Sequence, residues 1–188
     1  AGYTQFMLAG LTMNGLQIAI MLVLCPLIAR EFQHHGYEKS IPSWLILGAK
    51  VLCVLVMAVP SFFLSLGFFY YSFAVPVQGS LAALAVMITA FCLAVAGIMV
   101  LFAVLSPDAV MSIEMPLLYI MPGLLYSGLS WPDFYMSDVA AAIAQIFPMR
   151  HAADSVRDIL LAGYAPALVS QSLQLLLMGA GAFALGTA

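Results

Sequence analysis

Charged side chains are scarce in this sequence. Only 7% of its 188 residues are Asp, Glu, Lys or Arg, whereas 65% are hydrophobic. Soluble globular domains carry about 25% charged residues, because their surfaces need polar side chains. The composition therefore excludes a water-soluble domain and indicates a protein of the lipid bilayer. The five Lys and Arg form no run, so the chain also lacks the basic face that a nucleic acid partner requires.

Cysteine is equally sparse, and Cys25, Cys53 and Cys92 each lie within an apolar run. A thiol in such surroundings behaves as a small hydrophobic group, and we expect no disulfide. The first residues include neither an initiator methionine nor a basic segment, so no signal peptide is expected there. We expect the chain to be a piece of a longer one.

Five apolar runs have the length of a bilayer crossing or nearly reach it. A hydrocarbon core about 30 Å thick requires about 20 residues of helix. We place the runs at about residues 6–28, 43–70, 80–105, 113–129 and 165–187. Each should be a helix, because backbone amides that face lipid must bond within their own segment. The alternating pattern of a membrane barrel is missing. The sequence therefore predicts an all-α membrane protein with a single transmembrane domain over residues 1–188.

Two polar side chains interrupt the first run. Asn14 and Gln17 lie one turn apart and so share a helical face. That face should meet protein and not lipid, because polar groups within spans commonly form hydrogen bonds between helices. The pair is a candidate for a packed seam between two copies or, less simply, for the substrate pathway.

The first cluster of charges, in the loop at residues 30–42, separates the first two runs. It is too polar to span, and its early part has the pattern of a short amphipathic helix, since Glu31 and His35 lie four residues apart and Gly36 offers a stop. Glu31, His35 and Glu38 share a face and form a weak alternative metal site, which lacks a further ligand. Pro42 then restarts the chain at an interface.

Residues 130–163, between the last two runs, form the second polar stretch. Each of its two amphipathic pieces has one apolar face, made of Val139, Ala142, Ile143 and Ile146 in the first and of Ala153, Val156, Leu160 and Leu161 in the second. Pro148 separates the pieces and Gly163 ends the second. Each piece has about ten residues and is too short to span. The sequence therefore predicts a re-entrant helical hairpin at one membrane face.

Two smaller features of the middle runs also carry expectations. Gly97 lies in a run of Ala, Val and Leu, a composition that suits close packing between helices. Asp108 and Glu114 flank the start of the fourth run, where negative charge complements a helix N-terminus. We expect them to cap that helix.

The order of these residues resembles the membrane permeases of type-2 ABC exporters, a family of drug, lipid and polysaccharide export permeases. The family's link between its last two spans carries a pattern of Ser-Gly, Pro, Met, Pro, Arg and Gly, found here as Ser127, Gly128, Pro132, Met136, Pro148, Arg157 and Gly163. The family's Glu, Gly, Glu and Gly-x-Lys series resembles Glu31, Gly36, Glu38, Gly48 and Lys50. The chain departs from the family in having Tyr37 where a Thr is usual, Ser137 where a Pro is usual, and a shorter loop before Lys50.

The resemblance implies an arrangement in the membrane. The five runs correspond to the family's second to sixth spans, so a first span, commonly followed by a large extracytoplasmic domain, is expected before Ala1. The polar segment would be a cytoplasmic coupling helix that docks on a separate ATPase, with the coupling residues Arg30, Glu31, Gly36, Glu38, Lys39 and Lys50. The hairpin would lie at the outer side as a gate.

The resemblance also implies partners. They are an ABC ATPase that holds ATP and Mg²⁺, a second permease copy, membrane lipid and, for drug efflux, a periplasmic adaptor, all at the inner membrane of a bacterium. This chain has no Gly-rich loop followed by Lys and Ser or Thr, so it cannot bind ATP in that way. We expect it to carry no catalytic residue, cofactor or metal. An exporter permease for a drug, a lipid or a polysaccharide is the resulting hypothesis.

Two other functions stay open at the level of sequence. Gly128, Leu129 and Ser130 form a fragment of a serine nucleophile motif, and His151 is a candidate base for an intramembrane serine protease. The motif is short, and His151 belongs to a charged amphipathic piece next to Arg150. A secondary transporter would usually carry an ionisable residue near the middle of a span, which the runs do not show.

Overall fold

The computed structural model describes residues 3–34, 42–73, 77–128 and 136–187. These residues form seven α-helices and no strand, which confirms the all-α prediction. Four helices are long and apolar enough to cross a membrane, namely α1 (Tyr3–His34), α2 (Ser43–Phe73), α3 (Leu81–Leu105) and α7 (Leu168–Thr187). Three are shorter, namely α4 (Met111–Leu125), α5 (Asp138–Ala144) and α6 (Pro148–Ala162).

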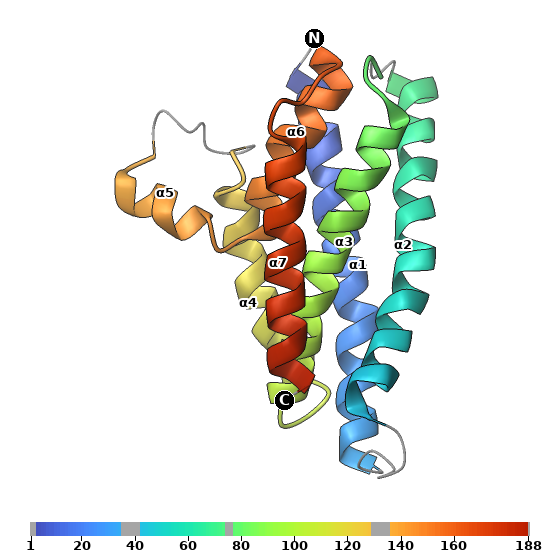
Figure 1. Ribbon diagram of the computed structural model, residues 1–188, viewed down its shortest axis with the longest axis vertical. Helices are drawn as coiled ribbons and strands as arrows, with labels where there is room; N and C mark the ends of the chain where they lie inside the picture. Colours follow the sequence, from blue (N-terminus) through green and yellow to red (C-terminus); the bar gives the residue numbers. More distant parts are fainter. Residues whose placement is uncertain (1–2, 35–41, 74–76, 129–135, 188) are drawn as a thin grey trace.

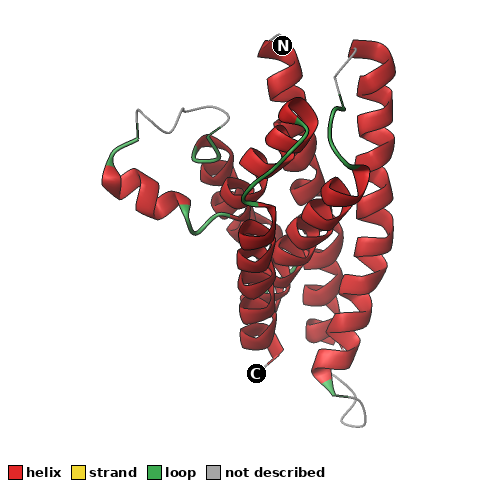
Figure 2. Cartoon of the chain, turned by 45° about the horizontal axis from the view of Figure 1, so that its top comes forward, coloured by secondary structure: helices red, strands yellow, loops and turns green. Residues whose placement is uncertain are grey.

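The long helices run side by side, and α2 runs opposite to the other three (Figures 1 and 2). α1 descends in Figure 1, α2 returns, α3 descends, and α7 descends to the C-terminus. We call the lower end of the bundle, where α1 ends and α2 begins, the α1–α2 end, and the upper end the α2–α3 end.

Helix α3 is the centre of the bundle. Its most apolar stretch is 67% buried, against 44%, 28% and 17% for the corresponding stretches of α1, α2 and α7. It packs against α1, α2, α4, α6 and α7, and its contact with α7 is the most extensive between any two helices in the described part of the chain. Such burial explains why α3 has no polar face to show in the sequence.

Glycine brings α3 and α7 together. A Cβ added at Gly97 would overlap the carbonyl oxygen of Gly179, and one added at Gly179 would lie 2.8 Å from the Cα of Ala94. Backbones approach this closely only where side chains are absent. The expectation that Gly97 serves close helix packing is confirmed.

The structure differs from the predicted spans in two places. α1 continues without a break to His34, so Arg30 and Glu31 belong to its last turns and not to a separate helix. α4 has 15 residues and is about 22 Å long at 1.5 Å per residue, short of a bilayer core of about 30 Å. Four span candidates are therefore found where five were predicted.

The predicted hairpin consists of two unlike helices. α6 packs into the bundle against α1, α3, α4 and α7, and α5 stands away from it (Figure 1). The apolar face of α6 is buried as far as Leu160. In contrast, Val139, Ile143 and Ile146 are 70%, 41% and 59% exposed. They belong to α5 and the two residues that follow it, which we call the α5 arm (residues 138–146). α6 begins beside the upper end of α4, where the ring of Phe147 lies against Gly123, and continues toward the α2–α3 end.

Candidate functional site

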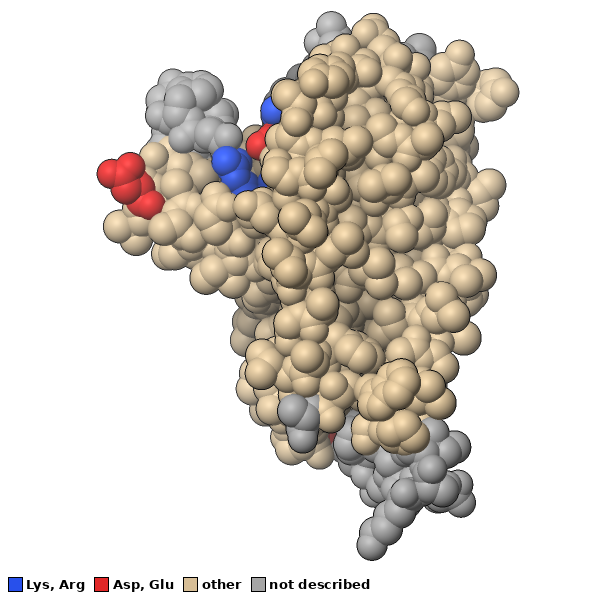
Figure 3. Space-filling model, in the orientation of Figure 1, with Lys and Arg blue, Asp and Glu red and all other residues tan. Residues whose placement is uncertain are grey.

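The charged side chains that the structure describes lie in two regions. One is the α1–α2 end, with Arg30, Glu31 and Lys50 and the caps of α4; the other is the side of α6 near the α5 arm. Figure 3 shows the second region beside an otherwise uncharged surface. These two regions contain the residues for which the family resemblance predicts coupling and gating.

At the α1–α2 end, the carboxylate of Glu31 pairs with the ammonium of Lys50. Lys50 lies about two turns into α2, and its Nζ atom has less than 1 Å² of exposed surface. The Glu31 side chain is 41% exposed, and Arg30 next to it is exposed. The pair therefore joins the end of α1 to the beginning of α2.

The remaining coupling candidates, Gly36, Glu38 and Lys39, lie outside the described residues. So does His35, which leaves the alternative metal site untested. Among the residues that the structure describes, no three His, Cys, Asp or Glu gather as a metal site.

Asp108 caps α4 at the same end. Its Oδ1 atom accepts hydrogen bonds from the backbone N–H groups of Val110 and Met111, at 2.9 and 2.8 Å. Glu114 is exposed in the first turn of α4. Capping by Asp108 is confirmed.

The hairpin candidates begin where α4 ends. Ser127 is fully buried, and its hydroxyl donates to the carbonyl of Leu124 at 2.7 Å. Gly128 follows with a φ of 81°, a left-handed conformation that favours glycine. Pro132 lies outside the described residues, Met136 is half-buried, and Pro148 opens α6. Their role as a gate stays a prediction.

A group of aromatic rings holds the start of α6 against α4, which the sequence analysis did not find. The Tyr119 hydroxyl donates to the carbonyl of Ile146 at 2.7 Å. The ring of Phe147 lies 5.1 Å from that of Tyr119 and is stacked with Tyr126 at 6.1 Å, measured between centroids. Phe147 lies 21 and 28 positions after the two tyrosines and in another helix segment, so only the folded chain reveals the cluster.

Ion pairs line the polar side of α6. Arg157 Nη2 lies 3.1 Å from Asp154 Oδ1, and Arg157 Nε lies 3.6 Å from Asp158 Oδ1. Arg150 Nη1 lies 3.9 Å from Asp154 Oδ2, four residues away. Arg157 thus pairs with two carboxylates of its own helix. The side chains in these ion pairs are 19% to 40% exposed.

The opposite side of α6 is fastened to two neighbours. The hydroxyl of Ser155, which is 2% exposed, bonds to the side-chain oxygen of Gln171 in α7. At the α2–α3 end the backbone N–H of Gln78 donates to the carbonyl of Leu160 at 3.1 Å. Gly163 ends α6 with a φ of 78° and lies close to Gln78. The second helix of the hairpin is thereby fixed to the turn that begins α3.

Asn14 and Gln17 bond to each other within α1. The Gln17 side-chain amide donates to the Asn14 oxygen at 2.9 Å, and Gln17 is 3% exposed. Their role in a seam or pathway stays a prediction. His151 is 7% exposed, with Nε2 at 3.0 Å from the carbonyl oxygen of Gln145. Ser130 lies outside the described residues, so the protease hypothesis gains nothing here.

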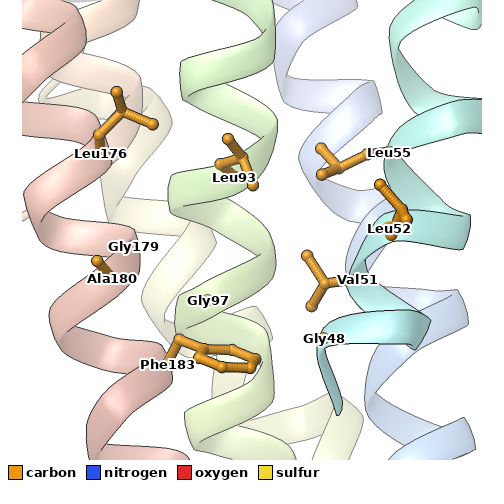
Figure 4. Close-up of a pocket in the computed structure, with 10 residues that line it drawn as sticks. All are labelled: Gly48, Val51, Leu52, Leu55, Leu93, Gly97, Leu176, Gly179, Ala180 and Phe183. Atoms are coloured by element: carbon orange, nitrogen blue, oxygen red, sulfur yellow. The ribbon is translucent and has the colours of Figure 1, made fainter. Parts of the chain in front are cut away.

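An apolar groove of about 450 Å³ opens between α2, α3 and α7 (Figure 4). Its floor is the glycine crossing of α3 and α7, and Val51 and Leu55 of α2 face Leu93 of α3 and Phe183 of α7 across it. No charged residue lines it. All of its lining residues are apolar, so the groove is complementary to hydrocarbon groups.

The described residues thus form an apolar helical bundle with an ion pair at one end and, at the other, a helix fastened to its neighbours. Comparison with curated proteins and with solved structures gave no match. The family model described as ABC-2 family transporter protein matches residues 1–188, which is the whole chain. Members of this family are permeases, which generally work as dimers with an ABC ATPase. The chain therefore belongs to the ABC-2 family of transporter membrane proteins.

Proposed function

We propose that this permease exports a substrate of the drug, lipid or polysaccharide class across the inner membrane of a bacterium, driven by a separate ATPase. The observation that carries the proposal is the joint at the α1–α2 end, where the polar segment after α1 interrupts an otherwise apolar chain. In this proposal that end is cytoplasmic, and the segment from Arg30 to Lys39 receives the ATPase. Two permease copies and two ATPase subunits form the transporter.

The physical requirement is a difference in binding between two states. A ligand shifts a conformational equilibrium only if it binds the two conformations with different affinity. ATP does not act on the permease directly, so the ATPase surface must bind the two permease conformations differently. A charged segment at the end of α1 supplies such a surface, and α6 at the far end is the part that would open.

The first test is co-purification. The tagged full-length permease, extracted from its native membrane, should bring down an ATPase with a Gly-rich phosphate loop. Isolation of the permease without any ATPase would contradict the proposal.

The second test is a charge reversal at Glu38. Glu38→Lys should reach the membrane at the normal level but lower ATP-driven uptake of a lipophilic dye into inverted vesicles by about tenfold, equivalent to about 1.4 kcal/mol. Glu114→Lys is the matched control, because Glu114 is exposed at the same end but lies in α4. Normal transport by the Glu38 variant would refute the assignment of the coupling segment.

A further inference from the structure

We propose that Glu31 and Lys50 are an internal positioning pair, which makes the end of α1 and the start of α2 move as one body when the ATPase displaces the coupling segment. The inference rests on the proposed function and narrows it. It assigns Glu31 to a contact between α1 and α2 within the permease. The contact with the ATPase is left to other side chains of the segment.

The first observation is burial on the Lys50 side. The Nζ atom of Lys50 has less than 1 Å² of exposed surface, although Lys50 lies within an apolar helix. A cation there is costly unless an opposite charge accompanies it. Glu31 supplies that charge, so the carboxylate is committed to a group within the same chain.

The second observation is the continuity of α1. The helix is continuous from Tyr3 to His34, with Pro26 inside it, so Glu31 sits on a helical extension of the span. A force applied to the segment after His34 therefore reaches α1 directly. The pair then passes part of that displacement to α2, in addition to the direct packing of α1 on α2.

The third observation separates Glu31 from its neighbour. Arg30, the preceding residue of α1, is exposed, whereas the Glu31 carboxylate is paired with Lys50. A residue that docks on a partner must offer its charge to the partner. Arg30 meets this condition as it stands, whereas Oε2 of the half-exposed Glu31 carboxylate is already engaged with Lys50.

A charge exchange tests the pair. The full-length permease with its co-purified ATPase is reconstituted in vesicles, with a reporter cysteine at Ala141, which is exposed on the α5 arm. Cys53, the exposed native thiol, is changed to Ser. The readout is the change in the labelling rate of the reporter with an impermeant maleimide when ATP is added. Glu31→Lys and Lys50→Glu should each reduce that change at least fivefold while the ATPase still co-purifies. The double exchange should restore it to within about twofold of the parent, because the pair is re-formed with its charges reversed.

Two results would overturn the inference. One is a double exchange as defective as either single change. The other is loss of the ATPase from Glu31→Lys without recovery in the double exchange, which would make Glu31 a docking residue. Glu114→Lys, the same charge change on α4, should leave the response unchanged. A parent chain that binds no ATPase would overturn the proposed function instead, and the inference with it.

If the charge variants do not reach the membrane, a cross-linking experiment tests the pairing of residues 31 and 50. Glu31→Cys with Lys50→Cys, treated in membranes with a short bis-methanethiosulfonate reagent, should give a link within one chain, seen in the peptide masses. Its absence in a chain of normal membrane level would contradict the pairing.

Discussion

At the scale of single residues, the contact between Gly97 and Gly179 leaves no room for a side chain at either position. The backbones of α3 and α7 meet there without intervening side chains. Neither helix could be recognised as the other's partner from its own pattern, because a glycine in an apolar run shows only that some close neighbour is expected. The structure identifies that neighbour as α7.

Gly97→Leu should destabilise the fold. A leucine side chain would occupy the position of the Gly179 carbonyl, and forcing extra carbon into a packed interior costs about 1–3 kcal/mol. We expect a loss at or above the top of that range in the free energy of unfolding, measured by titrating the purified permease with dodecyl sulfate in mixed micelles. Gly181→Leu is the control, since Gly181 is exposed and no atom lies near its missing Cβ. Equal stability of the two variants would argue against the crossing.

At the scale of elements, the attachment of α6 limits how the α2–α3 end can move. Its two fastenings are the bond from Ser155 to Gln171 and the contact with the turn at Gln78 and Gly79. A gate formed by α6 must release the second contact before its C-terminal end can leave α3. Gly79 is therefore the residue at which the gate should be most sensitive to added volume.

Gly79→Val should loosen the end of α6. A Cβ at Gly79 would lie 2.9 Å from Cγ2 of Ile159 and closer still to the Ile159 carbonyl oxygen, which is tighter than side chains tolerate. Amide hydrogen exchange over the C-terminal turns of α6 should rise at least tenfold relative to the parent, because local opening becomes easier. Gly67→Val, where no atom lies within 4 Å of the missing Cβ, should leave that exchange unchanged. Unaltered protection in Gly79→Val would mean that the turn does not hold α6.

The sequence predicted which segments are helical far better than what each helix touches. Runs of apolar residues specify helices in a bilayer, since backbone groups have no other partner there. Both α5 and α6 have one apolar face in the sequence. In the structure, the apolar face of α6 packs against protein, whereas that of α5 is exposed. Amphipathicity reports that a face is apolar and does not report its neighbour. The continuation of α1 to His34 was missed because polar residues were taken to end the helix, although they are compatible with it.

The candidate sites divide in the same way. The family resemblance predicts Glu31 and Lys50 as coupling residues, whereas their pairing depends on two helices meeting at one end of the bundle. The ring of Phe147 between Tyr119 and Tyr126 was not foreseen, because contacts between helices at unrelated spacings leave no mark in a single sequence.

At the scale of the whole molecule, the two charged regions lie on either side of a bundle centred on α3. The α1–α2 end holds the pair that is tied to α2, and α2 leads to the turn that holds α6. α2 therefore carries Lys50 near its start and precedes, in sequence, the turn at Gln78 that holds α6. Whether a displacement passes along α2 between these two places requires evidence from variants at both ends.

The position of the α5 arm predicts how the whole molecule lies in the membrane. Val139, Ile143 and Ile146 form an apolar face on a short helix that stands away from the bundle. Exposed apolar surface on such a helix is stable when it enters the boundary between head groups and acyl chains. We expect the face of Val139 to contact lipid and the opposite face, at Ala141, to contact water.

Spin labels measure this directly. Labels at Val139→Cys and Ala141→Cys are compared in a chain with Cys53→Ser, because Cys53 is the exposed native thiol among the three. The Val139 label should be more accessible to oxygen, which concentrates in lipid, than to a water-soluble nickel chelate. The Ala141 label, about 200° around the helix, should show the reverse. Equal chelate access at both positions would place the arm in water and require a different surface to cover its apolar face.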